Sequence, residues 1–163
     1  MWPRCSPKTA ATTDMAGVVC CDTSFLFSLY GRDAHAAQAL AESVRLGQPV
    51  TLSALVEYEL LNAVRLAGFR HKLPPPAVAA MIAAFDADVA SGRLVIQRDS
   101  LGQIVAEARR LSALHTLAGG YRAFDILHVA AAVHSKAAIF LTFDANQRAL
   151  AEAAGLKVRP GAR

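Results

Sequence analysis

Four acidic residues stand where their carboxylates could act together on a metal ion. Asp22 directly follows the apolar run GVVCC, and Asp144 comes two residues after the run AAIFLT. Asp125 begins the apolar segment DILHVAAAVH, whereas Glu59 lies inside the segment ALVEYELLNAVRLAG. Carboxylate oxygens are the ligands that hard divalent cations such as Mg²⁺ and Mn²⁺ prefer. The residue types therefore indicate a divalent metal site, provided that the fold brings them together.

The three aspartates have a second interpretation, because aspartate is a preferred N-cap and suits the positive end of a helix dipole. For Asp22 or Asp144 taken alone, capping is the better explanation. In a parallel α/β sheet, however, the helices that follow the strands all begin at one edge, where ligands bind. Carboxylates gathered there would repel each other and raise one another's pKa values unless a cation neutralised them. The shared placement of the three aspartates therefore favours a metal site.

Glu59 is expected at the border of the apolar stripe of its helix rather than on the fully solvated face. The stripe consists of Val56, Leu60, Ala63 or Val64, and Ala67. Asn62 follows Glu59 by three residues and shares its side of the helix. A solvated surface glutamate is the alternative for Glu59, and Glu57 is the rival carboxylate on a different face.

The segments that must position these residues alternate between short apolar runs and longer helical ones. Strands are predicted at residues 17–21, 49–52, 93–97 and 137–142, with a possible edge strand at 156–158. Helices are predicted at residues 23–30, 34–46, 54–67, 77–89, 100–114, 124–134 and 145–154. Ser53 is expected to cap the third helix and Gly68 to end it, and a loop is expected at 117–122. The alternation predicts an α/β fold with a parallel sheet covered by helices on both faces.

Length and composition favour one domain and argue against a membrane-spanning protein. The chain has 163 residues, of which 54% are hydrophobic, and a mean hydropathy of +0.31. Its longest apolar run, 77–85, is much shorter than the roughly 18 to 20 residues of a spanning helix. There are 17 basic and 13 acidic residues, and the net charge is +4. If four acids bind metal, the bases exceed the remaining acids by a wider margin, which favours a polyanionic partner.

The cysteines and the first residues give little functional information. Cys5, Cys20 and Cys21 have no ligand-like spacing, so we expect reduced core residues rather than a zinc or redox site. Residues 1–14 are interpreted as a disordered lead, with the true start possible at Met15, and residues 15–163 as the folded domain. A targeting peptide is the alternative for this lead, although it lacks the apolar run of a secretory signal. The expected location is the cytoplasm.

Four motifs occur in a characteristic order, namely VVCCDTS, LSALVEYELLNAVR, RAFDILHVAAA and FLTFDANQRALAEAAGLKV. In this order and spacing the chain resembles the PIN-domain ribonucleases, in particular toxins of the VapC type. The resemblance covers residues 17–158. It implies a three-layer α/β sandwich with a mostly parallel sheet of four or five strands and helices on both faces.

The resemblance also implies roles for individual residues. Asp22, Glu59, Asp125 and Asp144 would be the catalytic residues and would bind one or two Mg²⁺ or Mn²⁺ ions. Bound ions would activate a water molecule and stabilise charge on the phosphate during hydrolysis of RNA. The supporting residues would be Ser24, Asn62 and Thr142. Arg122 either binds a phosphate of the RNA or is an ordinary loop arginine.

Partners and other residues follow from the same resemblance. It implies RNA as the substrate, a small antitoxin that masks the acidic cleft, and a homodimer, with the apolar helix surface at 78–85 available for either protein contact. His128 is interpreted as a core histidine, although it lies three residues after Asp125. Tyr121 and Phe124 could stack on an RNA base, but core packing is the preferred interpretation.

Two other functions remain open on the residues alone. One is a noncatalytic RNA-binding or partner-binding module with the same fold. The other is a different phosphohydrolase with aspartates at strand ends. A dehalogenase-type phosphatase would need an aspartate where Ser24 stands, and the acid pair and late lysine of a receiver domain are not convincing in this chain.

Overall fold

The computed structural model describes residues 17–161. The lead at 1–14, the alternative start at Met15, and Cys5 lie outside the described residues. Within the described part of the chain, no helix is both long enough and apolar enough to cross a membrane.

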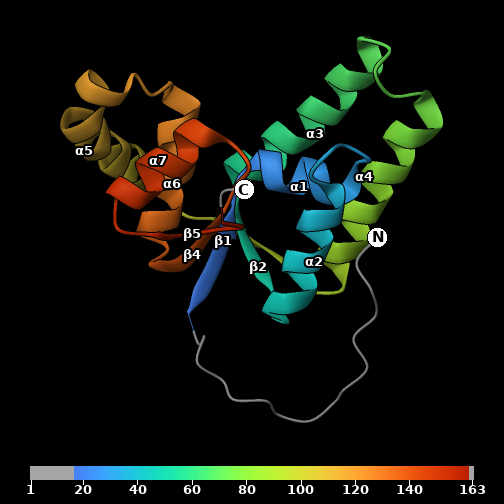
Figure 1. Cartoon of the computed structure of the whole chain (residues 1–163), viewed down its shortest axis with the longest axis horizontal. Coiled ribbons are helices and arrows are strands. Elements are labelled where there is room, and N and C mark those ends of the chain that lie inside the picture. The colour runs from blue at the N-terminus through green and yellow to red at the C-terminus, as the bar shows by residue number, and fades with distance from the viewer. Residues whose placement is uncertain (1–16, 162–163) are drawn as a thin grey trace.

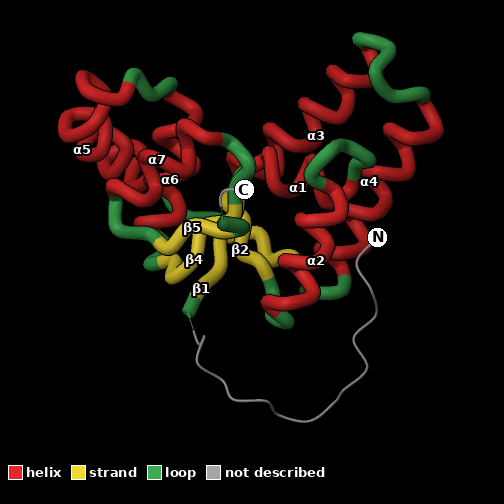
Figure 2. The backbone as a smooth tube through the Cα atoms, viewed as in Figure 1, coloured by secondary structure: helices red, strands yellow, loops and turns green. Residues whose placement is uncertain are grey.

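Five parallel strands form a single sheet at the centre of the molecule (Figure 2). The strands are β1 (Val18–Cys21), β2 (Val50–Ser53), β3 (Leu94–Gln97), β4 (Ala137–Leu141) and β5 (Lys157–Arg159). Their order is β3-β2-β1-β4-β5, so that β5 is an edge strand as expected. The chain moves outward from β1 to β3 on one side and returns to place β4 on the other side of β1. This reversal lies between β1 and β4, and ligands of such sheets bind beyond the strand ends at that point.

Helices cover both faces of the sheet, which confirms the expected three-layer sandwich. One layer contains α1 (Thr23–Tyr30), α2 (Ala36–Leu46), α3 (Ala54–Phe69) and α4 (Pro75–Ala90). The other contains α5 (Leu101–Gly119), α6 (Ala123–His134) and α7 (Ala145–Ala153). Figure 1 shows these two groups on opposite sides of the strands.

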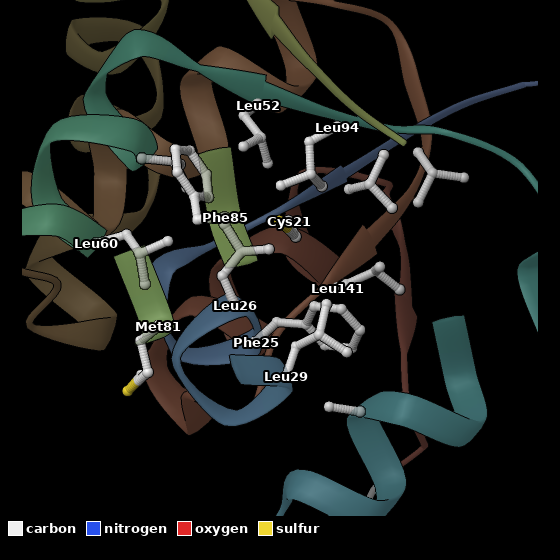
Figure 3. Close-up of a cluster of buried hydrophobic side chains, with 14 of the residues drawn as sticks. Cys21, Phe25, Leu26, Leu29, Leu52, Leu60, Met81, Phe85, Leu94 and Leu141 are labelled. Carbon is white, nitrogen blue, oxygen red and sulfur yellow. The ribbon is translucent and has the colours of Figure 1, made fainter. Parts of the chain in front are cut away.

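The alternating side chains of the strands divide the core into two clusters. Cys21 points into the cluster beneath α1 to α4, where it lies near Phe25, Leu52 and Phe85 (Figure 3). Its neighbour Cys20 points to the opposite face and packs in the cluster under α5 to α7. Both thiols are free and buried, as the sequence predicted.

Several helix ends differ from the predictions, and two of these differences involve glycines. The third helix continues through Gly68 to Phe69, so the expectation that Gly68 ends it is wrong. A Cβ atom at Gly68 would lie 2.9 Å from Val78 Cγ2, so glycine here permits close packing of α3 on α4. Helix α5 runs to Gly119 instead of ending at residue 114, because the first left-handed residue that can terminate it is Gly120, with φ of 65°.

Candidate active site

The carboxyl edge of the sheet brings together the helix N-termini that carry the three aspartates. Asp22 follows β1 and caps α1, with its Oδ1 accepting from the backbone N–H of Phe25 at 2.9 Å. Asp144 follows β4 and caps α7, with its Oδ1 accepting from the N–H of Gln147 at 2.9 Å. Asp125 lies in the first turn of α6. Asp22 and Asp144 are therefore both N-caps, as one interpretation predicted. They also lie at the same edge of the sheet, as the metal-site interpretation requires.

A cleft of about 430 Å³ opens at this edge. Its walls include Glu59, Asp125 and Asp144, three of the four carboxylates singled out in the sequence. The fourth, Asp22, is fully buried and lies behind the wall. Ser24 connects Asp22 to the cleft, because Ser24 lines the cleft and its hydroxyl donates to both Asp22 oxygens at 2.8 Å.

Burial opposes the ionisation of Asp22. It raises the pKa of this carboxyl from 3.8 to about 6, while hydrogen bonds from Thr142, the Phe25 backbone and Ser24 act in the opposite direction. The shortest of these hydrogen bonds is donated by Thr142 Oγ1 to Asp22 Oδ2 at 2.6 Å. A nearby cation would favour the ionised form of such a carboxyl. The surroundings of Asp22 thus suit a site that acquires positive charge.

Arg122 lies between the two aspartates of the cleft wall. Its Nε donates to Asp125 Oδ2 at 2.9 Å, and its Nη2 is 3.7 Å from Asp144 Oδ2. The hydrogen bond and the charge of Asp125 raise the pKa of Arg122, and Asp144 adds to this effect. The arginine side chain is 71% exposed, and exposed ion pairs contribute little to stability. An exposed positive charge therefore stands between these two carboxylates.

Glu59 is held by two side chains of other elements. His128 Nε2 lies 2.6 Å from Glu59 Oε2, and the Thr23 hydroxyl donates to the same oxygen. The His128 hydrogen bond is the largest cause of a lowered pKa for Glu59, against which partial burial acts. The imidazole is 1% exposed, so His128 is buried as expected, but it contacts the candidate site rather than serving only as core. The signal in the sequence was its position one helical turn after Asp125.

The remaining predicted residues fall into two groups. Ser24 and Thr142 contact Asp22, as described above, and Tyr121 packs in the cluster of α5 to α7. Phe124 is exposed, so the core-packing interpretation is wrong for this residue. Asn62 is exposed on α3 and does not line the cleft, so the structure does not bring it to the other site residues.

Several polar residues in the cleft wall were not predicted as site residues from the sequence, namely Thr23, Ser28, Asp33, His35 and Gln147. Gln147 Nε2 donates to Asp125 Oδ1 at 3.4 Å, and Asp33 enters from the turn between α1 and α2. None of these residues has a distinguishing pattern in the sequence, although the position of Gln147 in the first turn after Asp144 is a usable signal.

The oxygen donors of the site fit a hard divalent cation, but in the described residues they are not already arranged around one metal position. Among residues 17–161, no three His, Cys, Asp or Glu side chains already surround one metal position. Arg122 occupies the space between Asp125 and Asp144, and Glu59 is turned toward His128. The site supplies several carboxylate and hydroxyl oxygens, which are the ligand type that Mg²⁺ and Mn²⁺ prefer.

The sequence of the domain matches a family model. The model of the PIN domain matches residues 19–153, a span that contains all four carboxylates. The chain belongs to the PIN-domain family. This membership agrees with the five-stranded parallel sheet and its two helical layers.

Solved structures share the architecture of this PIN domain at low sequence identity. The toxin VapC20 of Mycobacterium tuberculosis, described as cleaving the sarcin-ricin loop, is 22% identical, with a TM-score of 0.61 over 87% of this chain and 99% of its own. VapBC2 from Rickettsia felis, bound to a DNA fragment from their promoter, is 14% identical, with a TM-score of 0.61 over 87% and 97%. FitAcB from Neisseria gonorrhoeae is 19% identical, with a TM-score of 0.58 over 86% and 96%. No curated protein has a matching sequence. At these identities the similarity establishes the fold alone.

Proposed function

We propose that this PIN domain is a metal-dependent endoribonuclease that hydrolyses RNA phosphodiester bonds in the cytoplasm, as the toxin of a toxin–antitoxin pair. The observation that carries the proposal is the cleft at the carboxyl edge of the sheet, where Glu59, Asp125 and Asp144 line the wall in front of the buried Asp22. The basic excess of the chain outside this cleft supports a polyanionic substrate.

The four carboxylates would hold one or two Mg²⁺ or Mn²⁺ ions. Bound ions of this kind lower the pKa of a water nucleophile and stabilise negative charge on the phosphate. Asp22, Asp125 and Asp144 are the proposed direct ligands, and Glu59 either binds the ion or positions a water molecule.

The other residues of the site would position these carboxylates and the substrate. Ser24 and Thr142 fix the orientation of Asp22 through their hydroxyls. His128 and Thr23 fix Glu59 in the same way. Arg122 is exposed enough to leave the carboxylates and to bind a phosphate oxygen of the RNA. Arg122 would then exchange its ion pairs with Asp125 and Asp144 for an ion pair with the phosphate.

Cleavage of RNA by the purified protein tests this function directly. Total RNA incubated with Mg²⁺ or Mn²⁺ should be cut at defined positions, and a chelator should prevent the cuts. Asp125→Asn and Asp144→Asn should lower the rate by roughly 100-fold or more, since loss of groups that merely support a metal ligand already costs 10–100-fold. Glu57→Gln is the matched control, because Glu57 lies on α3 near Glu59 but outside the cleft wall. Full activity of either aspartate variant would contradict the assignment.

An antitoxin and a second copy of the chain are the proposed protein partners. Exposed apolar side chains in both helical layers support this proposal. A groove of about 720 Å³ between α1 and α4 has a mainly apolar lining that includes Leu29, Leu73 and Met81. Large apolar side chains are also exposed at Phe69 and Leu117, near the ends of α3 and α5. Light scattering of the purified chain, with and without a short protein encoded beside its gene, measures both associations.

A noncatalytic binding module is the second candidate, and one observation favours it. Arg122 already neutralises Asp125 and Asp144 in part, so the acids could persist without an ion. Stabilisation by Mn²⁺ would not separate the two functions, because a binding module could also hold the ion. Absence of metal-dependent RNA cleavage would favour the module.

A further inference from the structure

Three aromatic rings form a parallel stack that runs from the core to the edge of the cleft. Phe25 and Phe143 lie with ring centroids 5.7 Å apart and planes 14° apart. Phe143 and His35 follow with centroids 4.5 Å apart and planes 16° apart. Phe25 is fully buried, Phe143 is half-buried and His35 is exposed. The last ring of the stack therefore presents a face to solvent.

The stack belongs to the same cleft as the carboxylates. His35 and Phe143 both line it, and Phe143 is the residue directly before Asp144. The backbone N–H of Phe143 donates to Ser24 Oγ at 2.9 Å, which ties the middle ring to the residue that holds Asp22. His35 is the residue before α2, and its side chain makes no capping hydrogen bond to that helix. Helix capping thus does not account for the position of the imidazole.

We propose that the outward face of His35 is a stacking platform for an unpaired nucleobase of the RNA, next to the phosphate that is cleaved. The inference rests on the proposed function and adds to it a base-binding subsite in the same cleft. Single-stranded nucleic acids are commonly bound by aromatic side chains on which bases stack, because every base has a π face. Phe143 and Phe25 support His35 from behind, so the platform is held in place before RNA arrives.

Asp33 gives this subsite a preference among bases. Its Oδ1 accepts from the backbone N–H of His35 at 2.9 Å, and its Oδ2 accepts from Ser28 Oγ at 2.8 Å. The carboxylate is thereby fixed beside the platform with lone pairs left on both oxygens. Guanine presents an imino and an amino donor side by side, which match a carboxylate better than the single amino group of cytosine or adenine. Uracil, which lacks an amino group, is the least suitable base.

Binding of short single-stranded RNA in Ca²⁺, measured by fluorescence anisotropy, tests the platform without relying on cleavage. The probes are a guanine-containing oligonucleotide and copies of it with one abasic site moved along the strand. For the wild-type protein, one abasic position should weaken binding by about 5- to 150-fold, the range of a base–aromatic stack. His35→Ala should weaken binding of the intact strand by a similar factor and become insensitive to that abasic site. His35→Phe should restore both, and Asp33→Asn should reduce only the preference for guanine.

His115→Ala is the matched control, because His115 lies on α5 outside the cleft and its loss should change neither probe. Unchanged binding and unchanged abasic sensitivity in a folded His35→Ala protein would overturn the proposal. Rescue by His35→Leu as good as rescue by His35→Phe would also overturn it, since it would show that apolar packing suffices. If the wild-type protein binds and discriminates the probes but cuts no RNA, the nuclease function fails and the platform stands. If it cuts RNA but ignores the abasic site, the platform fails and the nuclease function stands.

Discussion

At the scale of single residues, the site depends on how each carboxylate is surrounded. Asp22 is fully enclosed and hydrogen-bonded, Glu59 is bonded to a buried histidine, and the two remaining aspartates share an exposed arginine. These surroundings differ although the four side chains carry the same functional group. The free-energy cost of holding each carboxylate in the fold is therefore separable from its use in binding a metal ion.

Asp22→Asn should stabilise the metal-free protein. Because burial raises the folded pKa of Asp22 from 3.8 to about 6, the folded state binds more protons than the unfolded state between these values. The free energy of unfolding therefore falls as pH rises through this window, and the ionised carboxyl is unfavourable at neutral pH. Asparagine removes this charge, so at neutral pH in chelator the variant should be more stable by up to about 3 kcal/mol. Urea unfolding at several pH values measures this difference, which should shrink as the pH is lowered toward 4; a constant difference would contradict the explanation.

His128→Leu should weaken metal binding without unfolding the protein. The substitution removes the hydrogen bond to Glu59 Oε2, and loss of such supporting groups lowers metal affinity by about 10- to 100-fold. Stability should change little, because His128 Nδ1 is buried without a hydrogen-bond partner in the described chain and leucine removes that unpaired atom. Calorimetric titration with Mn²⁺ gives the affinity, and His134→Gln, at the far end of α6, is the control. Equal affinity in the variant and the wild type would show that His128 does not position Glu59.

At the scale of elements, one buried ion pair joins two segments that are far apart in the sequence. Glu42 of α2 accepts from Arg159 Nε of β5 at 2.7 Å, and both side chains are nearly buried. Arg45 also contacts Glu42, at 2.9 Å, but its side chain is 61% exposed. The ion pair between Arg159 and Glu42 therefore joins the edge strand β5 to helix α2.

Glu42→Ala should be far more destabilising than Arg45→Ala. Removing one partner of a buried ion pair leaves an uncompensated charge and typically costs about 3 to 5 kcal/mol. The exposed partner should contribute only about 0 to 1 kcal/mol. Denaturant unfolding of the two variants measures both values. An equal loss of unfolding free energy in the two variants would mean that Arg159 binds water or another acceptor when Glu42 is absent.

At the scale of the whole molecule, a single sheet separates two hydrophobic clusters. Cys20 and Cys21 are neighbours in β1, yet their thiols belong to opposite clusters. Burial raises the pKa of Cys20 to about 12, with a smaller effect from Asp99, and burial also raises the pKa of Cys21 well above its usual value. Both thiols are thus inert in the folded protein and report separately on the opening of each helical layer.

The two thiols should react with a thiol reagent at the same slow rate. Since both clusters pack on the same strands, we expect the layers to open together in one cooperative unfolding event. A Cys5→Ser variant removes the third cysteine, and mass spectrometry distinguishes labelling at Cys20 from labelling at Cys21. Leu111→Ala, on the α5 side, should accelerate labelling of both thiols, because a buried leucine-to-alanine change costs about 2 to 5 kcal/mol. Faster labelling of Cys20 alone would show that the layer of α5 to α7 opens independently.

The sequence alone determined the order of elements, the parallel sheet and the placement of the aspartates at strand ends. These features depend on local patterns, namely short apolar runs, helical periodicity and the residue that follows each strand. Even the N-cap role of Asp22 and Asp144 could be stated from residue type. The sequence did not determine the helix ends. Gly68 suits both a helix end and a close helix contact, and only the position of Val78 decides between them.

The tertiary structure decided which side chains meet. His128 reaches Glu59 only because α6 packs beside α3, and Arg122 stands between Asp125 and Asp144 only because α6 and α7 begin at neighbouring points of the sheet edge. The stack of Phe25, Phe143 and His35 joins three segments with no shared motif. Such contacts depend on the separation and rotation of packed elements, which residue spacing within one segment does not encode.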